Sequence, residues 1–224
     1  NDPDLAEATA KLARKFGISK EEQDDWSINS HLNALKSKEI LSSEITPILN
    51  QTNDLFTREL NKKICERAPK LSDTITHANS AIAADAAGFV VLVSELFLKN
   101  KMCKAVEILG SGTSGVIPEE APLAPVGAIK ALLDHTEISL SNVAFIELME
   151  AYAAQAIICT RLCDLDLDKV NIRGGALSRG HPIGASGAIL VVRLFNELIK
   201  TPGASGMAAI AAAGGIGSAM MLKS

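Results

Sequence analysis

Residues 104–224 alternate between short apolar runs of the strand type and longer stretches with helical spacing. An alternation of this kind is typical of layered α/β structures, in which most strands are parallel and right-handed crossovers join them. We therefore expect an α/β fold with a mainly parallel sheet. The predicted strands are 104–115, 143–149, 169–177 and a pair across a glycine turn within 206–222, and the predicted helices are 124–137, 151–165 and 184–199.

Residues 1–72 form a different zone, which is polar and mainly helical in pattern. A first helix is expected over 4–17. Ser19 and Glu22 have the spacing of a capping box, so a second helix should begin there. The rest of this zone is predicted to be an extended stretch at 45–49 and an irregular connector at 50–72.

Residues 73–103 connect the two zones. Their first part has the pattern of a short strand and a loop, and residues 81–100 have the pattern of an almost wholly buried helix. The sequence thus predicts three parts, with boundaries at 1–72, 73–103 and 104–224.

The charge and composition of the chain exclude several partners. The 224 residues carry 22 Lys and Arg against 26 Asp and Glu, so the excess of positive charge that nucleic acids attract is absent. No apolar run reaches the roughly 18 residues that span a bilayer, and the first residues are acidic, unlike a signal peptide. We expect neither a nucleic-acid nor a membrane partner.

The cysteines point to a reducing compartment. Four cysteines in 224 residues are too few for a disulfide scaffold, which favours the cytoplasm. Cys159 and Cys163 would share a helix face, but two ligands alone do not make a zinc site. We expect buried core thiols and no metal.

The predicted helix at 184–199 is apolar around most of its circumference. A helix of this kind is buried on more than one side. One sheet covers only one side, so a second element must cover the other.

The loop before this helix places His181 between Gly180 and Pro182, and three chemical interpretations of its surroundings compete. Ser186 resembles a loose nucleophile elbow, but no strand leads directly into it and no histidine follows it. Residues 213–217 resemble a phosphate-binding loop, but no helix follows. Alternatively, His181 is a site residue at the mouth of the sheet, whose imidazole exchanges a proton near pH 7. On the residues alone, a structural loop histidine is an equal alternative.

The segment 171–188, NIRGGALSRGHPIGASGA, closely resembles the Asn-x-x-Gly-Gly-Ala and Gly-His-Pro-x-Gly-Ala-Ser-Gly signature of the thiolases. The resemblance extends over the whole chain. It relates residues 17–31 to the family's helical loop domain, 74–87 to its Asn-Ala-Ser-Gly loop, 146–156 to its Asn-Glu-Ala-Phe segment and 206–221 to its Cys-x-Gly segment.

The resemblance implies a thiolase-like layered fold of the αβαβα family. Here it implies the C-terminal βαβαβαββ half together with the helical loop domain. The implied activity is that of an acetyl-CoA C-acetyltransferase, which moves an acyl group between a cysteine and coenzyme A and makes or cleaves 3-ketoacyl-CoA in fatty acid metabolism. Coenzyme A is then a substrate, and no cofactor is bound permanently.

The family's site residues carry over only in part. His181 matches the histidine that activates the thiolate, so we assign it as catalytic. Asn79, Met149 and Ala211 occupy the expected substrate-binding positions, but Met149 stands where the family has asparagine and Ala211 where it has its second cysteine. A thioether cannot donate a hydrogen bond, and an alanine cannot carry a proton.

The part of the family that bears the nucleophilic cysteine has no match in these residues. We therefore expect this chain to be inactive alone, and to need a missing N-terminal half or a partner subunit, within a homo-oligomer that acts on acyl-CoA. The alternative is a degenerate thiolase that serves as an acyl-CoA binding or scaffolding subunit.

Overall fold

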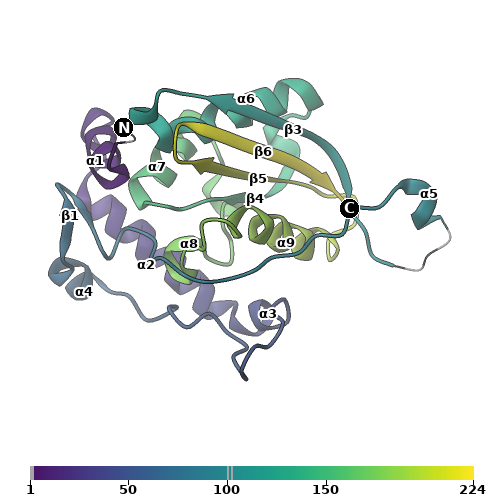
Figure 1. The fold of residues 1–224 in the computed structure, drawn as a ribbon, viewed down its shortest axis with the longest axis horizontal. Coiled ribbons are helices and arrows are strands. Elements are labelled where there is room, and N and C mark those ends of the chain that lie inside the picture. The colour runs from purple at the N-terminus through teal and green to yellow at the C-terminus, as the bar shows by residue number, and fades with distance from the viewer. Residues whose placement is uncertain (1–2, 100, 102) are drawn as a thin grey trace.

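The computed structural model describes residues 3–99, 101 and 103–224. Its centre is a four-stranded mixed sheet in the order β3-β6-β5-β4 (Figure 1). The outer strand β4 is parallel to β5, whereas β6 runs antiparallel to both of its neighbours. The strands are β3 (Glu107–Gly115), β4 (Val143–Leu148), β5 (Ser205–Ala212) and β6 (Ile216–Lys223).

The expectation of a mainly parallel sheet is wrong for the described residues, since one of the three strand pairs is parallel. The reason is the glycine turn. Gly214 and Gly215 both adopt positive φ, which lets β5 fold straight back into β6, and a hairpin makes its two strands antiparallel. The hairpin itself confirms the prediction of two strands across a glycine turn.

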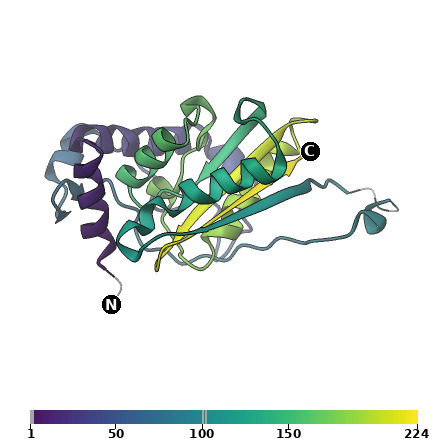
Figure 2. The same ribbon diagram turned by 90° about the horizontal axis from the view of Figure 1, so that it is seen from above.

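Helices cover both faces of this sheet, as the predicted α/β alternation requires (Figures 1 and 2). Met207 on β5 packs with α6 (Ala124–Thr136) and α7 (Ala153–Leu162) in one apolar cluster. The next residue, Ala208, points to the other face and packs with α9 (Ser186–Leu198). This alternation along the strand places one buried layer on each side.

Glycines on the strands let helix α6 lie close to the sheet. A Cβ atom on Gly112 would stand 2.4 Å from the carbonyl oxygen of Ala128, and one on Gly217 would stand 2.1 Å from that of Ala124. Any side chain at either position would push the helix away from the sheet.

The predicted helices of residues 1–72 are confirmed. The capping box is complete, because the Ser19 hydroxyl accepts from the Glu22 backbone N–H and the Glu22 carboxylate accepts from that of Ser19. The stretch at 45–49 ends in a turn, and the predicted irregular connector contains a helix and a strand. This part comprises α1 (Leu5–Lys15), α2 (Lys20–Lys36), α3 (Lys38–Ser42), α4 (Lys62–Arg67) and β1 (Lys70–Ser72), followed by β2 (Ile75–Thr76).

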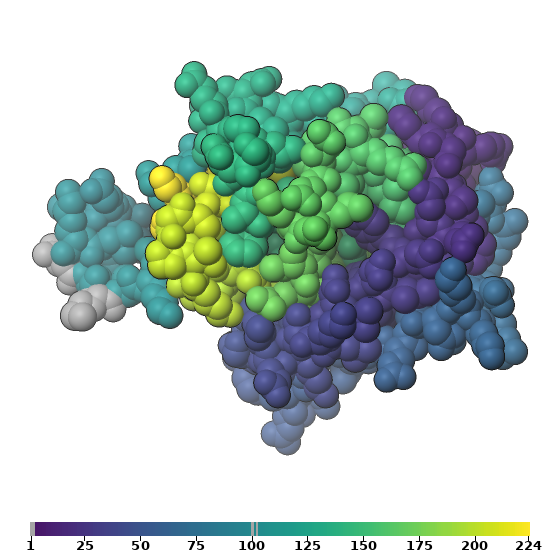
Figure 3. Space-filling view, turned by 180° about the vertical axis from the view of Figure 1, so that it is seen from behind, coloured from purple at the N-terminus to yellow at the C-terminus, as the bar shows by residue number. Residues whose placement is uncertain are grey.

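The predicted buried helix at 81–100 is wrong for its described residues, and residue 100 lies outside them. Residues 84–93 run extended beside the start of α9, and only α5 (Glu95–Leu98) is helical. The β-branched valines of this run favour an extended backbone, and Gly88 weakens a helix. Its apolar side chains are exposed, with Phe89 at 87% and Val91 at 85%. Figure 3 shows the residues around α5 standing away from the body.

The predicted strand at 169–177 is also wrong. Val170 makes a single bridge to Ile146, after which the chain turns at Asn171 into the short helix α8 (Ala176–Arg179). The Asn171 side chain takes the place of a strand partner, since its amide accepts from the Leu148 N–H at 2.9 Å and donates to the Leu148 carbonyl at 2.8 Å.

Helix α9 buries Leu190, Leu194 and Leu198 against the sheet. Its other side is only partly covered, and the extended residues 84–93 lie over its first turn, where Gly88 faces Ala188. Within the described part of the chain, none of the helices has the length and apolarity to cross a membrane. The remaining elements are the short 3₁₀ turns Pro118–Leu123, Leu140–Asn142 and Leu167–Lys169.

The buried His31 predicts a pH-dependent stability. Its ring lies against Phe56 with a centroid distance of 5.6 Å, and its Nδ1 accepts from the Arg58 N–H. Burial, aided by the charge of Arg58, lowers the pKa of His31 from 6.5 to about 4. Between pH 6.5 and pH 4 the unfolded chain binds a proton at His31 that the folded chain does not. The stabilisation that comes from burying the neutral ring is therefore complete above pH 6.5 and is lost as the pH falls toward 4. The free energy of unfolding should fall by roughly 3 kcal/mol over this range.

Urea unfolding of the chain between pH 7 and pH 4 measures this contribution. We expect His31→Gln to flatten the fall in the free energy of unfolding, whereas His77→Gln, at an exposed position, leaves the fall unchanged. Equal slopes for His31→Gln and the unaltered chain would contradict the assignment.

Candidate active site

The loop between α8 and α9 presents His181 at the end of the sheet where β4 terminates. The His181 N–H donates to the Ile82 carbonyl at 2.7 Å, which ties the loop to the chain just before the extended residues 84–93. Gly180 has φ +98, and a Cβ atom there would lie 2.8 Å from that of Ala84. The close approach and the positive φ explain why glycine precedes the histidine.

The imidazole of His181 is half-buried and held by a neighbour on the first turn of α9. Its Nδ1 lies 2.7 Å from the hydroxyl oxygen of Ser186. Burial lowers the pKa of His181 below its usual 6.5, so the ring is neutral near pH 7. A neutral imidazole in a fixed orientation can take up a proton from a substrate or from a thiol.

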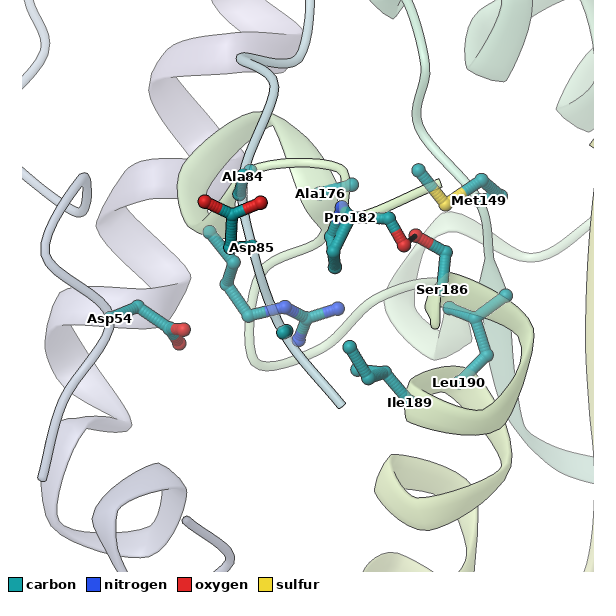
Figure 4. A pocket seen from close by; sticks show the side chains of 12 residues that line it. Asp54, Ala84, Asp85, Met149, Ala176, Pro182, Ser186, Ile189 and Leu190 are labelled. Atoms are coloured by element: carbon teal, nitrogen blue, oxygen red, sulfur yellow. Dashed lines mark hydrogen bonds between the residues drawn. The ribbon is translucent and has the colours of Figure 1, made fainter. Parts of the chain in front are cut away.

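Two hollows adjoin this loop. The wider one, of about 500 Å³, lies between residues 84–89 and residues 182–188. The smaller one, of about 80 Å³, is reached by Pro182 and Ser186 from the same loop. In Figure 4 its apolar wall, with Met149, Ile189 and Leu190, lies opposite Asp54.

The polar end of the smaller hollow was not found from the sequence. It consists of Asp54, Asp85 and Arg179. Burial raises the pKa of Asp54 and lowers that of Arg179, and both residues are only partly exposed. Arg179 could have been recognised as a candidate site residue, because it is a charged residue directly before Gly180 in a loop of small residues. Asp54 lies in the predicted connector, and nothing in the sequence around it indicates a site residue.

The structure brings His181 and Met149 to one region, since Met149 and the residues flanking His181 line the smaller hollow. Met149 is 3% exposed and packs with Leu190 and Leu194, and its thioether offers no hydrogen-bond donor. Ala211 pairs with Gly217 near the end of the hairpin and is not among the residues that line either described hollow.

Asn79 is fully buried, and its side chain makes three internal hydrogen bonds. It accepts from the Thr76 N–H at 2.8 Å, and it donates to the Asp24 carboxylate and to the Thr74 carbonyl, both at 3.1 Å. Asn79 therefore fixes the loop around β2 and joins it to Asp24 on α2. Its assignment as a substrate-binding residue stays a prediction, as does that of Ala211.

Glu150, directly after Met149, binds several elements around the site. Its buried carboxylate accepts from Trp26 at 3.0 Å and Ser30 at 2.9 Å, both on α2. It also accepts from the Asn171 amide at 2.7 Å and from the Leu177 N–H at 3.3 Å. One carboxylate thus joins the helical segment of residues 1–72 to the loop that leads to His181.

A second buried charge cluster fixes the turn after α3. Arg193 on α9 donates to Glu44, and its second terminal nitrogen lies 3.9 Å from Glu147 and 3.8 Å from Glu197. Arg173 donates to Glu197 at 2.9 Å. Burial raises the pKa of Glu147, which has one carboxylate oxygen without a partner among the described residues.

Three of the four cysteines have thiols that ionise with difficulty. Burial raises the pKa of Cys65 and of Cys163 to about 11, and that of Cys159 to about 12. The thiolate is the nucleophilic form, so these side chains are unreactive at neutral pH. Among the described residues, no group of three or more His, Cys, Asp and Glu side chains has an arrangement that could hold a metal ion.

Comparison with known proteins identifies the family to which this arrangement belongs. Residues 102–224 match the family model described as "Thiolase, C-terminal domain". The chain belongs to the thiolase family. This thiolase chain is 34% identical over 232 residues to a Bacillus subtilis protein named as a candidate acetyl-CoA C-acetyltransferase, YhfS, a match that covers 99% of the chain and 64% of that protein.

Solved structures share the thiolase fold. The crystal structure of the Bacillus anthracis acetyl-CoA acetyltransferase matches with a TM-score of 0.90 and 29% identity, over 97% of this chain and 59% of that one. The Acat5 thiolase from Ascaris suum, crystallised in complex with coenzyme A, matches with a TM-score of 0.88 and 28% identity, over 98% and 59%. The chain therefore spans about three fifths of the length of these relatives.

The carboxylate of Glu150 can be tested through the single tryptophan. Replacement by alanine removes the acceptor of Trp26, of Ser30 and of one of the two amide protons of Asn171, and we expect the free energy of unfolding to fall by about 3 kcal/mol. The fluorescence of Trp26 should shift to longer wavelength as water enters. Glu119→Ala, at an exposed position, should change neither quantity. An unaltered midpoint in Glu150→Ala would show that the network does not stabilise the fold.

Proposed function

We propose that this chain carries the acid–base part of a thiolase-type acyltransferase acting on acyl-CoA, of the acetyl-CoA C-acetyltransferase type. The neutral, half-buried imidazole of His181, beside a hollow that opens between two segments, is the observation that carries the proposal. The names of the relatives support the substrate class, and one of the similar structures is a complex with coenzyme A. Coenzyme A is then a substrate and not a permanently bound cofactor.

In this proposal His181 takes the proton of a thiol as the thiol attacks the acyl carbonyl. The transfer is favoured because the ring is neutral, and because a thiolate is the reactive nucleophile. The attacking cysteine is assigned to the part of the longer relatives that this chain does not match. Burial keeps Cys65, Cys159 and Cys163 protonated, and the exposed Cys103 lines neither of the two hollows beside His181. Cleavage of 3-ketoacyl-CoA by coenzyme A would place the protein in fatty acid metabolism.

The same proposal requires a further N-terminal half or partner subunit, and the extended segment of residues 84–93 supports it. Among the described residues, the backbone of residues 85–93 takes part in no hydrogen bond, although all of these residues except Asp85 and Gly88 carry apolar side chains. Unpaired extended backbone readily accepts another strand. We assign this segment as the surface that the additional half covers, within a homo-oligomer. We place the protein in the cytoplasm, because free cysteines are typical of a reducing compartment.

A second candidate function is a degenerate thiolase that binds acyl-CoA without turning it over, or that serves as a scaffolding subunit. Met149 and Ala211 support it, because the thioether is buried among apolar side chains and the alanine carries no proton. In this case the hollow beside His181 would bind the ligand, and the imidazole would only donate or accept a hydrogen bond.

The first test measures cleavage of acetoacetyl-CoA by free coenzyme A. We expect no turnover above background from the 224-residue chain alone, because an activated thiol is lacking. Turnover that disappears in His181→Ala would contradict the assignment of the nucleophile to another segment.

The second test separates the two candidate functions in a protein extended to the length of its relatives. The double variant Met149→Asn and Ala211→Cys should raise turnover at least tenfold if the site is catalytic, because each replacement adds a group that assists proton transfer or charge stabilisation. Binding of coenzyme A, measured by calorimetry, is the control. Unchanged binding without any gain in turnover would favour the binding subunit.

A further inference from the structure

Ser186 is the first residue of α9 and is only 3% exposed. Its hydroxyl oxygen lies 2.7 Å from Nδ1 of His181 and 3.2 Å from the carbonyl oxygen of Pro182. Both neighbours come from the loop that the helix continues. The hydroxyl is therefore enclosed by these two polar atoms.

The protons in this group can be assigned by counting donors. A hydroxyl has one proton to give and lone pairs to accept with, and a carbonyl oxygen can only accept. Both contacts are hydrogen bonds when Ser186 donates to Pro182 and accepts from Nδ1–H of His181. The Pro182 carbonyl already accepts from the Ala185 N–H at 2.7 Å and the Ser186 N–H at 3.0 Å. The reverse assignment would direct the Ser186 proton at Nδ1 and place its oxygen 3.2 Å from this carbonyl oxygen with no proton between them, so two electron-rich oxygens would face each other.

We infer that Ser186 is a positioning residue that holds the proton of neutral His181 on Nδ1 and thereby leaves Nε2 free as the proton acceptor. The role rests on the proposed function, because it explains which nitrogen meets the thiol. Among the described residues, Nε2 takes part in no hydrogen bond. The main chain of His181 is fixed as well, since its N–H donates to the Ile82 carbonyl.

The same arrangement stabilises the ring after it has taken a proton. The cation donates from Nδ1 to Ser186, and Ser186 donates to Pro182, so the new charge meets a short chain of oriented dipoles. Ser186 does not act as a nucleophile in this scheme. A nucleophile elbow needs an exposed oxygen, and this one is buried and already bonded.

The tautomer can be measured without any activity. Long-range ¹H–¹⁵N spectra of the labelled 224-residue chain report which imidazole nitrogen carries the proton, and His181→Gln identifies the signals among the four histidines. Above the pKa of His181 we expect Nδ1 protonated and Nε2 unprotonated. A protonated Nε2 in the unaltered chain would overturn the inference, whatever any variant shows.

Variants of Ser186 give a second readout. Ser186→Ala removes the acceptor of Nδ1–H, so the preference for this tautomer should weaken about fivefold and the pKa of His181 should fall further. Ser186→Thr keeps the hydroxyl and should restore both the tautomer preference and the pKa of His181. Ser27→Ala, which removes an equally buried serine hydroxyl on α2, should change neither.

The direction of the pKa change is decisive, because a serine that donated to Nδ1 would stabilise the neutral ring, and its removal would raise the pKa. A raised pKa in Ser186→Ala would therefore overturn the inference. An unchanged tautomer ratio would do the same. Neither outcome depends on acyl transfer, so the proposed function could fail in the cleavage assay while this assignment held.

Discussion

The carboxylate of Glu150 is the interaction on which the rest of the site depends. It stands just beyond the end of β4, fully enclosed, and binds donors from α2, from Asn171 and from α8. A buried carboxylate is costly unless its oxygens are saturated with donors, and here four donors meet it. Because these donors come from segments far apart in the sequence, the carboxylate sets their relative positions.

Asn171 extends this control toward the histidine. Its amide binds both backbone groups of Leu148, so the chain leaves the sheet at that point and enters α8. The loop after α8 then meets the chain just before the extended segment, where the His181 N–H donates to the Ile82 carbonyl. The position of the imidazole is thus the end of a series of buried polar contacts that starts at the sheet.

Much of the fold could be predicted from local patterns in the sequence. The alternation after residue 104, the capping box at Ser19 and the glycine hairpin are local patterns with local causes. Residues 84–93 were predicted wrongly, because their alanine-rich start suits a buried helix, whereas the valines that follow favour an extended backbone, and apolar periodicity does not separate the two. The turn at Asn171 also escaped, since a side chain replaces the backbone partner there.

The candidate site was predictable only in part. His181 stood out because glycine and proline flank it in a loop of small residues. Its neighbours Asp54 and Arg179 lie more than a hundred residues apart, and no local pattern connects them. The same is true of Glu44 and Arg193, which are 149 residues apart in the chain. Long-range charge pairing becomes visible only when the packing is known.

The extended segment has a consequence for how the isolated chain behaves in solution. Its valines and phenylalanine form a short, uncharged stretch whose amide and carbonyl groups bond to none of the described residues. Stretches of this composition build cross-β fibrils. Molecules left with this stretch uncovered would stack on one another as their concentration rises. Solubility of the protein would thus depend on the stretch being shielded soon after synthesis.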